Sequence, residues 1–268
     1  MNDGTIDISQ RAAVGSETTQ IGIQNNYSGM TAQEASQLAM DLFISNFPKL
    51  QQVAAEVAQK RVDELTEQIV QQLSYNKVTD FSPFADPDVQ YTLFKAQTNY
   101  ARFGTKAMLK TLTSLISRRI ECDNDFQLKV VIDKAISIAN YISPQQLDYL
   151  SLSFICKDVI FQELHTIEDL QQHLLYICDT FSMANISSVP YLTNMGCLEF
   201  KIIAVEFDYE SHAREYHFEP DQVKKIYPEF LKQIHTDYRV SYVGTILAIT
   251  NAEAKSKYKF DPKVWIKS

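Results

Sequence analysis

The stretch TAQEASQLAMDLFISNFPKLQQVAAEVAQKRVDELTEQIVQQL, residues 31–73, decides the fold class of this chain. It begins with Thr31 and Glu34, which have the spacing of a capping box, where the threonine hydroxyl and the glutamate carboxylate bind backbone amides at the start of a helix. Pro48 is expected to kink or restart this helix. Residues 50–73 keep a narrow apolar stripe, typical of a coiled coil or a bundle arm. The members of the stripe are Val53, Val57, Leu65, Ile69 and Leu73.

Helix-start patterns continue through the middle of the chain. Asp86 with Pro87, and Ser143 with Pro144, each combine a capping side chain with a proline in the first helical position. Gly104 is expected to separate two helices, because glycine favours the backbone conformation that ends a helix. The pattern predicts helices on both sides of Gly104, the second over residues 105–120, and further helices over residues 123–142, from 144 onward and over 166–183.

The last third of the chain is less regular. It predicts a short helix over residues 189–200, a strand over 201–209 and helices over 221–234 and 241–254, with Trp265 packed onto the body. The predicted fold class is mainly α: a multi-helix bundle with a short β-prone N-terminal arm and a small irregular or winged-helix-like C-terminal part. The expected parts are an arm (1–30), a long helical arm (31–76), a helical bundle (77–185) and a C-terminal α(+β) subdomain (186–268).

Composition limits the classes of function. The 268 residues carry a formal net charge of -8 and are 45% apolar, the balance of a globular protein, and the negative charge argues against nucleic acid or anionic membrane as a partner. The four cysteines lie far apart, as expected in a reducing compartment. Neither a signal peptide nor a membrane-spanning run is evident, so we expect a cytoplasmic protein without a membrane span.

Residues 19–27, TQIGIQNNY, have the character of a stacking β-segment. The run contains no charge and no proline, and in an extended chain one face carries Thr19, Ile21, Ile23 and Tyr27. Copies stacked about 4.8 Å apart would zip the isoleucines together and align the side-chain amides into ladders. Two other structures remain open for residues 5–27: a small hairpin that caps the helical body, and a disordered segment.

The same run resembles a known assembly motif. Gln20, Ile21 and Gly22, followed by Asn25, look like the core of the RIP homotypic interaction motif, whose pattern is Ile/Val-Gln-Ile/Val-Gly-x-x-Asn-x-apolar. Thr19 replaces the first Ile/Val of that pattern. Related motifs occur near the N-terminus of bacterial and fungal immune effectors and their receptors. The resemblance implies an interaction motif made of Thr19, Gln20, Ile21, Gly22, Ile23, Asn25, Asn26 and Tyr27.

The segment VSYVGTILAITN, residues 240–251, carries a second resemblance. It is similar to the closing segment of helical proteins from bacterial abortive-infection loci, where a helix with one glycine precedes a final Trp or Phe. Gly244 and Trp265 fit that outline. Together with the arm, the whole chain resembles a bacterial helical family that starts with QIGxQNNY followed by a helix. The resemblance implies a setting in phage defence and no mechanism.

Residues with catalytic or binding chemistry are sparse elsewhere. A lysine-rich tail could form a phosphate-binding stripe beside a winged helix, or simply a solvated surface, through Lys255, Lys257 and Lys259. The histidines do not have the spacing of a helical zinc pair and are interpreted as surface or capping residues: His165, His173, His212 and His217. The sequence contains no phosphate loop, nucleophile elbow or HExxH motif.

Three hypotheses follow for the function. The first is a non-enzymatic signalling or defence-associated protein, without cofactor or metal, that assembles with itself or recruits a protein partner through residues 19–27. The second is a DNA-binding regulator with a C-terminal winged helix, which the acidic composition disfavours. The third is a structural homo-oligomer in which residues 50–73 pack against a second copy.

Overall fold

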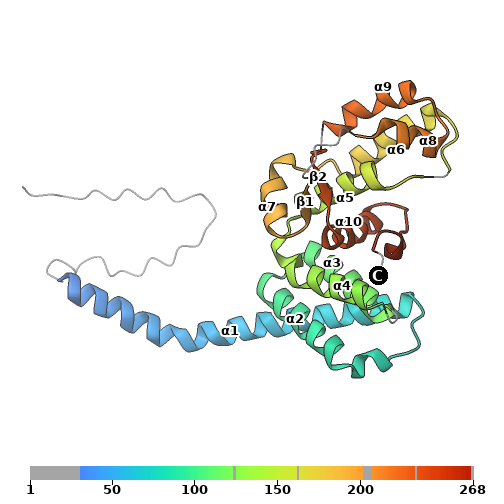
Figure 1. The fold of residues 1–268 in the computed structure, drawn as a ribbon. Helices are drawn as coiled ribbons and strands as arrows, with labels where there is room; N and C mark the ends of the chain where they lie inside the picture. Colours follow the sequence, from blue (N-terminus) through green and yellow to red (C-terminus); the bar gives the residue numbers. More distant parts are fainter. Residues whose placement is uncertain (1–30, 123–124, 162, 202–206, 233, 267–268) are drawn as a thin grey trace, which may run out of the picture. The chain divides into compact units, whose positions relative to one another are not determined.

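The structure is a computed structural model that describes residues 31–122, 125–161, 163–201, 207–232 and 234–266. These residues are mainly α-helical, which confirms the predicted multi-helix bundle (Figure 1). The chain divides into two units, residues 1–53 and residues 54–268. The first unit contains the beginning of the long helix α1 (Ala32–Tyr75), and the second contains the rest of α1 and the body.

Helix α1 begins where the capping box predicts. The backbone amide of Thr31 donates to Oε2 of Glu34 over 2.8 Å, and the amide of Glu34 donates to Oγ1 of Thr31 over 3.2 Å. Both halves of the capping box are therefore formed. The helix continues through Pro48 and does not restart there. Proline removes one backbone donor, and the hydrogen bonds of the neighbouring turns hold the helix on either side.

Capping side chains also set the starts of the next helices, as predicted. Asp86 caps α2, and Ser143 forms a capping box with Gln146 at the start of α5. Gly104 ends α2 in the left-handed conformation, with φ at 58°, which separates α2 from α3. The elements of this part are η1 (Ser82–Ala85), α2 (Pro87–Phe103), α3 (Lys106–Glu121), α4 (Phe126–Ile138), η2 (Ala139–Tyr141), α5 (Pro144–Asp158) and α6 (Ile167–Thr180).

The C-terminal part differs from the prediction around its first strand. The helix predicted over 189–200 ends at Asn194, shortly before Gly196 with φ at 74°, and a strand that the sequence does not predict begins at Leu198. The strand pairs antiparallel with a second strand, with Leu198 opposite Val240. The strand predicted over 201–209 falls largely on residues 202–206, which lie outside the described residues. The elements are η3 (Ile186–Ser188), α7 (Val189–Asn194), β1 (Leu198–Phe200), α8 (Tyr209–Tyr216), α9 (Pro220–Leu231), β2 (Tyr238–Val240), α10 (Tyr242–Lys255) and η4 (Pro262–Val264).

Helix α10 lies in the middle of the body and contacts α5, α4 and α3 (Figure 1). Ser241 caps it, so the helix predicted over residues 241–254 is confirmed. Gly244 allows a close approach, because a β-carbon at this position would lie 2.1 Å from the carbonyl oxygen of Cys197. Trp265 packs edge-on against Phe154 with ring centroids 4.9 Å apart, which confirms that the tryptophan packs onto the body.

A buried charged cluster joins α5 to α10. Asp148 is fully buried and accepts hydrogen bonds from Nδ2 of Asn251 over 2.9 Å and from Nζ of Lys255 over 2.6 Å. Asn251 also donates to the hydroxyl of Ser151 over 2.9 Å. A buried carboxylate that loses its cation typically destabilises a protein by about 3–5 kcal/mol. The cluster therefore ties α5 to α10.

Candidate functional sites

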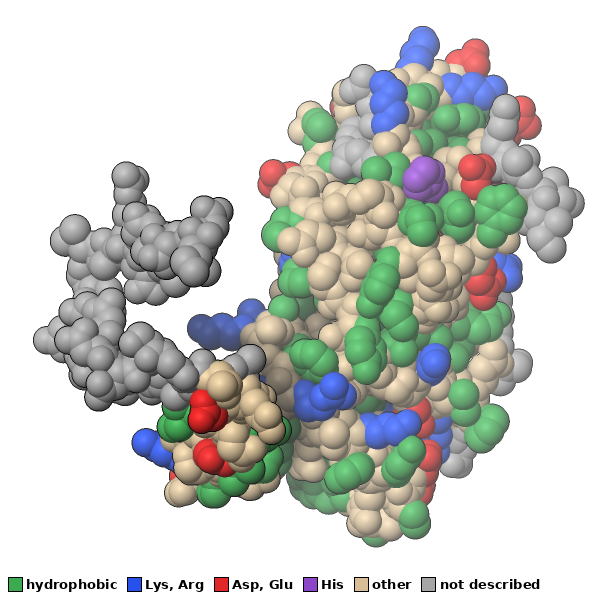
Figure 2. All heavy atoms as spheres, turned by 90° about the vertical axis from the view of Figure 1, so that its left-hand side faces the viewer, with side chains coloured by type: hydrophobic (Ala, Val, Ile, Leu, Met, Phe, Trp, Pro, Cys, Tyr) green, Lys and Arg blue, Asp and Glu red, His purple; other side chains and the backbone are tan. Residues whose placement is uncertain are grey.

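The first part of α1 exposes an unusual number of large apolar side chains. Their exposed fractions run from 36% at Leu38 to 60% at Ile44. Figure 2 shows apolar and acidic side chains together on the surface of the helix. A helix that exposes large apolar residues over several turns marks an interaction surface. Four of these residues share one side of the helix, and we call them the α1 apolar face: Leu38, Leu42, Leu50 and Val53.

The second part of α1 is held by the body. Leu65, Ile69 and Leu73 are buried in its core, so the stripe predicted over residues 50–73 is divided between an exposed and a buried part. Arg61 donates from Nη1 to the carbonyl oxygens of Ala101 over 2.8 Å and of Arg102 over 3.2 Å, at the end of α2. The same guanidinium occupies the space above Gly104, where a β-carbon would lie 2.1 Å from Nε.

The predicted interaction motif lies outside the described residues. Residues 19–27, with Thr19, Gln20, Ile21, Gly22, Ile23, Asn25, Asn26 and Tyr27, are not described by the structure. The motif therefore stays a prediction. What the structure describes is the helix that follows it, which begins at Ala32.

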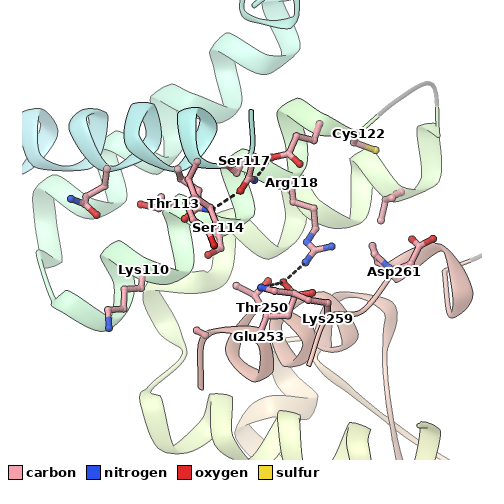
Figure 3. A pocket seen from close by; sticks show the side chains of 18 of the residues that line it. Lys110, Thr113, Ser114, Ser117, Arg118, Cys122, Thr250, Glu253, Lys259 and Asp261 are labelled. Carbon is pink, nitrogen blue, oxygen red and sulfur yellow. Dashed lines mark hydrogen bonds and ion pairs between the residues drawn. The ribbon is translucent and has the colours of Figure 1, made fainter. Parts of the chain in front are cut away.

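A polar groove of about 830 Å³ opens beside α3 in the second unit (Figure 3). One face of α3 lines it with Lys110, Thr113, Ser114, Ser117, Arg118 and Glu121. The other walls come from the end of α1, the end of α10 and the chain around η4. The groove therefore gathers polar side chains that are far apart in the sequence.

Glu253 of α10 has more polar partners among the described residues than the other two acids of the groove. Its Oε2 accepts from Nη2 of Arg118 over 3.2 Å and lies 3.8 Å from Nζ of Lys259 (Figure 3). Its Oε1 accepts from the backbone amide of Phe260 over 2.9 Å. The ion pair between Glu253 and Arg118 holds the guanidinium across the groove between α3 and α10.

The other two carboxylates of the groove also have donors. Oε1 of Glu121 accepts from Nδ2 of Asn76 over 2.6 Å, and Oδ1 of Asp261 accepts from the amide of Lys263 over 3.0 Å. Three buried polar atoms, by contrast, have no hydrogen-bond partner among the described residues: Thr113 Oγ1, Ser117 Oγ and Arg118 Nε. Each acid of the groove thus has at least one donor, whereas two hydroxyls and Nε of Arg118 have no partner in the part of the chain that the structure describes.

The three lysines predicted as a possible nucleic-acid contact do not act alike. Lys255 is bound to the buried Asp148, and Lys259 lies within ion-pair distance of Glu253. Lys257 is exposed, with Nζ 5.9 Å from the ring centroid of Tyr258. Lys255 therefore has a structural partner in the body, and a substitution there would disturb the α5–α10 cluster as well as any ligand contact.

Two of the histidines are not surface or capping residues, so that prediction is wrong for them. The ring of His173 lies 4.1 Å from that of Phe161, Nδ1 lies 2.9 Å from the hydroxyl of Tyr258, and burial lowers the pKa of His173 to about 4. Burial also lowers the pKa of His212, a residue of α8. His217 does cap α8, with φ at 58°, and His165 is exposed.

The sequence alone does not identify the groove. The only available indication is the spacing of Thr113, Ser117 and Glu121, which puts polar residues one turn apart on a helix that is otherwise largely buried. Such a pattern also fits a solvated helix face, and only the arrangement of α1 and α10 beside α3 shows that it lines a groove.

Two further properties of the described chain concern membranes and metals. No helix within residues 31–122, 125–161, 163–201, 207–232 and 234–266 is long and apolar enough to cross a membrane. In the same residues, no three His, Cys, Asp or Glu side chains are grouped so that they could hold a metal ion.

Comparison with known proteins gives one match. No curated protein and no solved structure matched the chain. A family model whose description reads ":-like" matches residues 29–238, a range that starts just before α1 and ends in β2, and so excludes both residues 19–27 and α10. Because this range is more than half of the 268 residues, the chain belongs to the family that this model describes.

Proposed function

We propose that this chain is a non-enzymatic signalling or defence-associated protein whose copies assemble through residues 19–27 and through the α1 apolar face. The exposed apolar face of α1 is the observation that carries the proposal. Exposed apolar surface of this kind is retained where a partner covers it, because water solvates it poorly. The proposed motif ends four residues before the capping box at Thr31, so both surfaces lie in one continuous stretch of chain.

A second copy of the same chain is the partner that fits both surfaces. An uncharged alternating segment stacks best on an identical segment. Each isoleucine then packs against an isoleucine, and each side-chain amide hydrogen-bonds to the same amide of the next copy. A helix with a long apolar face pairs with an equivalent helix in the same way. Self-association therefore satisfies the arm and the helix with one partner.

The two surfaces have different repeats, and this predicts two assembly states. Packed helices lie about 8–10 Å apart, whereas stacked strands lie about 4.8 Å apart. Neighbouring copies cannot follow both spacings continuously. We expect the α1 apolar face to join copies into small oligomers, and residues 19–27 to join those oligomers into larger assemblies.

The arm is tested in the full chain by light scattering and thioflavin fluorescence. Ile21→Asp places a charge in the stacking face and Gly22→Pro removes a strand donor, so both should abolish large assemblies. Ser16→Asp, which adds a charge outside residues 19–27, is the matched control and should assemble normally. If large assemblies form equally well in the Ile21→Asp or the Gly22→Pro chain, residues 19–27 do not drive assembly.

The helix is tested by sedimentation at concentrations where large assemblies are absent. Leu50→Glu with Val53→Glu charges the α1 apolar face and should convert small oligomers to monomers. Gln51→Glu with Ala55→Glu adds the same charge at exposed positions on the other side of the helix and should leave the oligomers unchanged. A wild-type chain that is monomeric throughout would contradict the proposal.

A further inference from the structure

We infer that the polar groove beside α3 binds an oxyanion, the phosphoryl or carboxylate group of a small polar molecule. The inference rests on buried hydrogen-bond donors that line the groove and lack acceptors. It is independent of assembly through residues 19–27, since every residue that it uses belongs to the body.

Two hydroxyl groups of α3 are buried in the groove without a partner. Thr113 is 6% exposed and Ser117 is 3% exposed, and neither hydroxyl has a hydrogen bond to any described residue. A helical hydroxyl usually donates to the carbonyl four residues earlier. Thr111 of the same helix does so over 3.0 Å, and Thr250 of α10 over 2.8 Å. Thr113 and Ser117, one turn apart, instead keep their hydroxyl protons for a group inside the groove.

Arg118 supplies a third donor at the same place. Its Nη2 is bound to Glu253, while Nε is buried with no acceptor in the described chain. A guanidinium can only donate hydrogen bonds, so Nε needs an oxygen atom. A buried charged donor without an acceptor is costly, and such groups are normally satisfied by a ligand or by water.

The chemistry of the leftover groups selects the ligand. All three carboxylates of the groove accept at least one hydrogen bond, whereas the two hydroxyls and Nε of Arg118 have no acceptor among the described residues, so an oxyanion matches the groups that lack a partner. An oxyanion would accept from Thr113, Ser117 and Nε of Arg118, and the ammonium groups of Lys110 and Lys259 at the rim would complement its charge. The volume of about 830 Å³ suits a small molecule.

Calorimetric titration of the full chain tests the inference with two probes, inorganic pyrophosphate for phosphoryl oxygens and citrate for carboxylate oxygens. At least one probe should bind, and more weakly as salt is added. Thr113→Val with Ser117→Ala should raise the Kd of that probe about tenfold or more, because two hydrogen bonds to an anion are lost. Thr111→Val, the same change on the same helix outside the groove, should leave the Kd unchanged.

Lys110→Gln and Lys259→Gln give an independent check at exposed positions, where the fold is not at stake. Each should raise the Kd several-fold while the circular dichroism spectrum stays that of the wild type. Failure of both probes to bind would overturn the inference, and so would equal weakening by Thr111→Val. A Thr113→Val/Ser117→Ala chain that is more stable than the wild type, with no probe bound to either, would show that the hydroxyls hold water only.

Discussion

The two halves of α1 share one sequence pattern and have opposite environments. In residues 32–53, Leu50 and Val53 are 56% and 50% exposed, whereas in residues 54–75, Leu65 and Leu73 are buried almost completely. Both halves alternate apolar and polar residues at helical spacing. The apolar stripe therefore predicts the helix correctly, and the body determines which part of the stripe is covered.

This contrast identifies what each half contributes. The second half is part of the core and is fixed by polar contacts such as that of Arg61 with the end of α2. The first half carries apolar residues of similar size that add nothing to that core. Substitutions matched across the two halves should therefore separate folding from assembly.

Leu65→Ala should have the largest effect. It removes a fully buried side chain and should lower the free energy of unfolding by about 2–5 kcal/mol, because a cavity remains in the core. Leu50→Ala, the matched change in the first half, should alter it by no more than about 0.5 kcal/mol. Urea unfolding at a concentration where the chain is monomeric measures both. Equal losses would mean that Leu50 also belongs to a folded core.

Arg61→Ala should have the next largest effect. It removes a cation that donates to two carbonyl oxygens at the end of α2 and should cost about 1–2 kcal/mol. Lys60→Ala changes the exposed neighbour on the same helix and should cost little. Urea midpoints of the two variants provide the comparison, and an Arg61→Ala midpoint equal to that of Lys60→Ala would show that the α1–α2 contact contributes nothing to stability.

Tyr100→Phe should have the smallest effect, and its size should depend on pH. Burial and the hydrogen bond to Glu64 over 2.7 Å raise the pKa of Tyr100 to about 12. Folding therefore favours the neutral phenol, and its contribution is complete below the unfolded pKa of about 10 and lost as the pH rises through about 12. At neutral pH the variant should lose about 1 kcal/mol.

Unfolding measured at about pH 8 and about pH 11 tests the sign of this dependence. The wild type should lose more stability than Tyr100→Phe between the two values, because only the wild type ionises at this site on unfolding. Other buried tyrosines, such as Tyr149, contribute to the fall in both chains alike. A steeper fall in the variant would contradict the assignment.

Much of the helical fold can be predicted from local patterns. Capping residues at Thr31, Asp86, Ser143 and Ser241 mark helix starts because the bonds that they form are local. The sequence does not predict β1, because this strand follows the turn at Gly196 and is held by β2, some 40 residues later in the chain. Pairing over that distance leaves no local pattern in the sequence.

The candidate sites can be predicted only in part. The apolar residues of α1 are recognisable in the sequence as helical spacing, but the burial of Leu65 and the exposure of Leu50 depend on whether the body covers that part of the helix. The groove has no sequence signature, because Ser117 and Glu253 come together only when α10 packs beside α3. The sequence misplaces His173 on the surface because its aromatic neighbours lie on separate segments.

The central place of α10 also has a consequence during synthesis. The ribosome makes α3 first and reaches α10 about 120 residues later, so at roughly 5–20 residues per second the nascent chain waits about 6–24 s. During that time α10 does not yet exist, so it cannot cover the faces of α3, α4 and α5 that it contacts in the folded chain. Residues 19–27 have by then already been made. The proposed assembly segment is therefore synthesised before the body can close, and we expect slower translation to lengthen the interval in which premature assembly could begin.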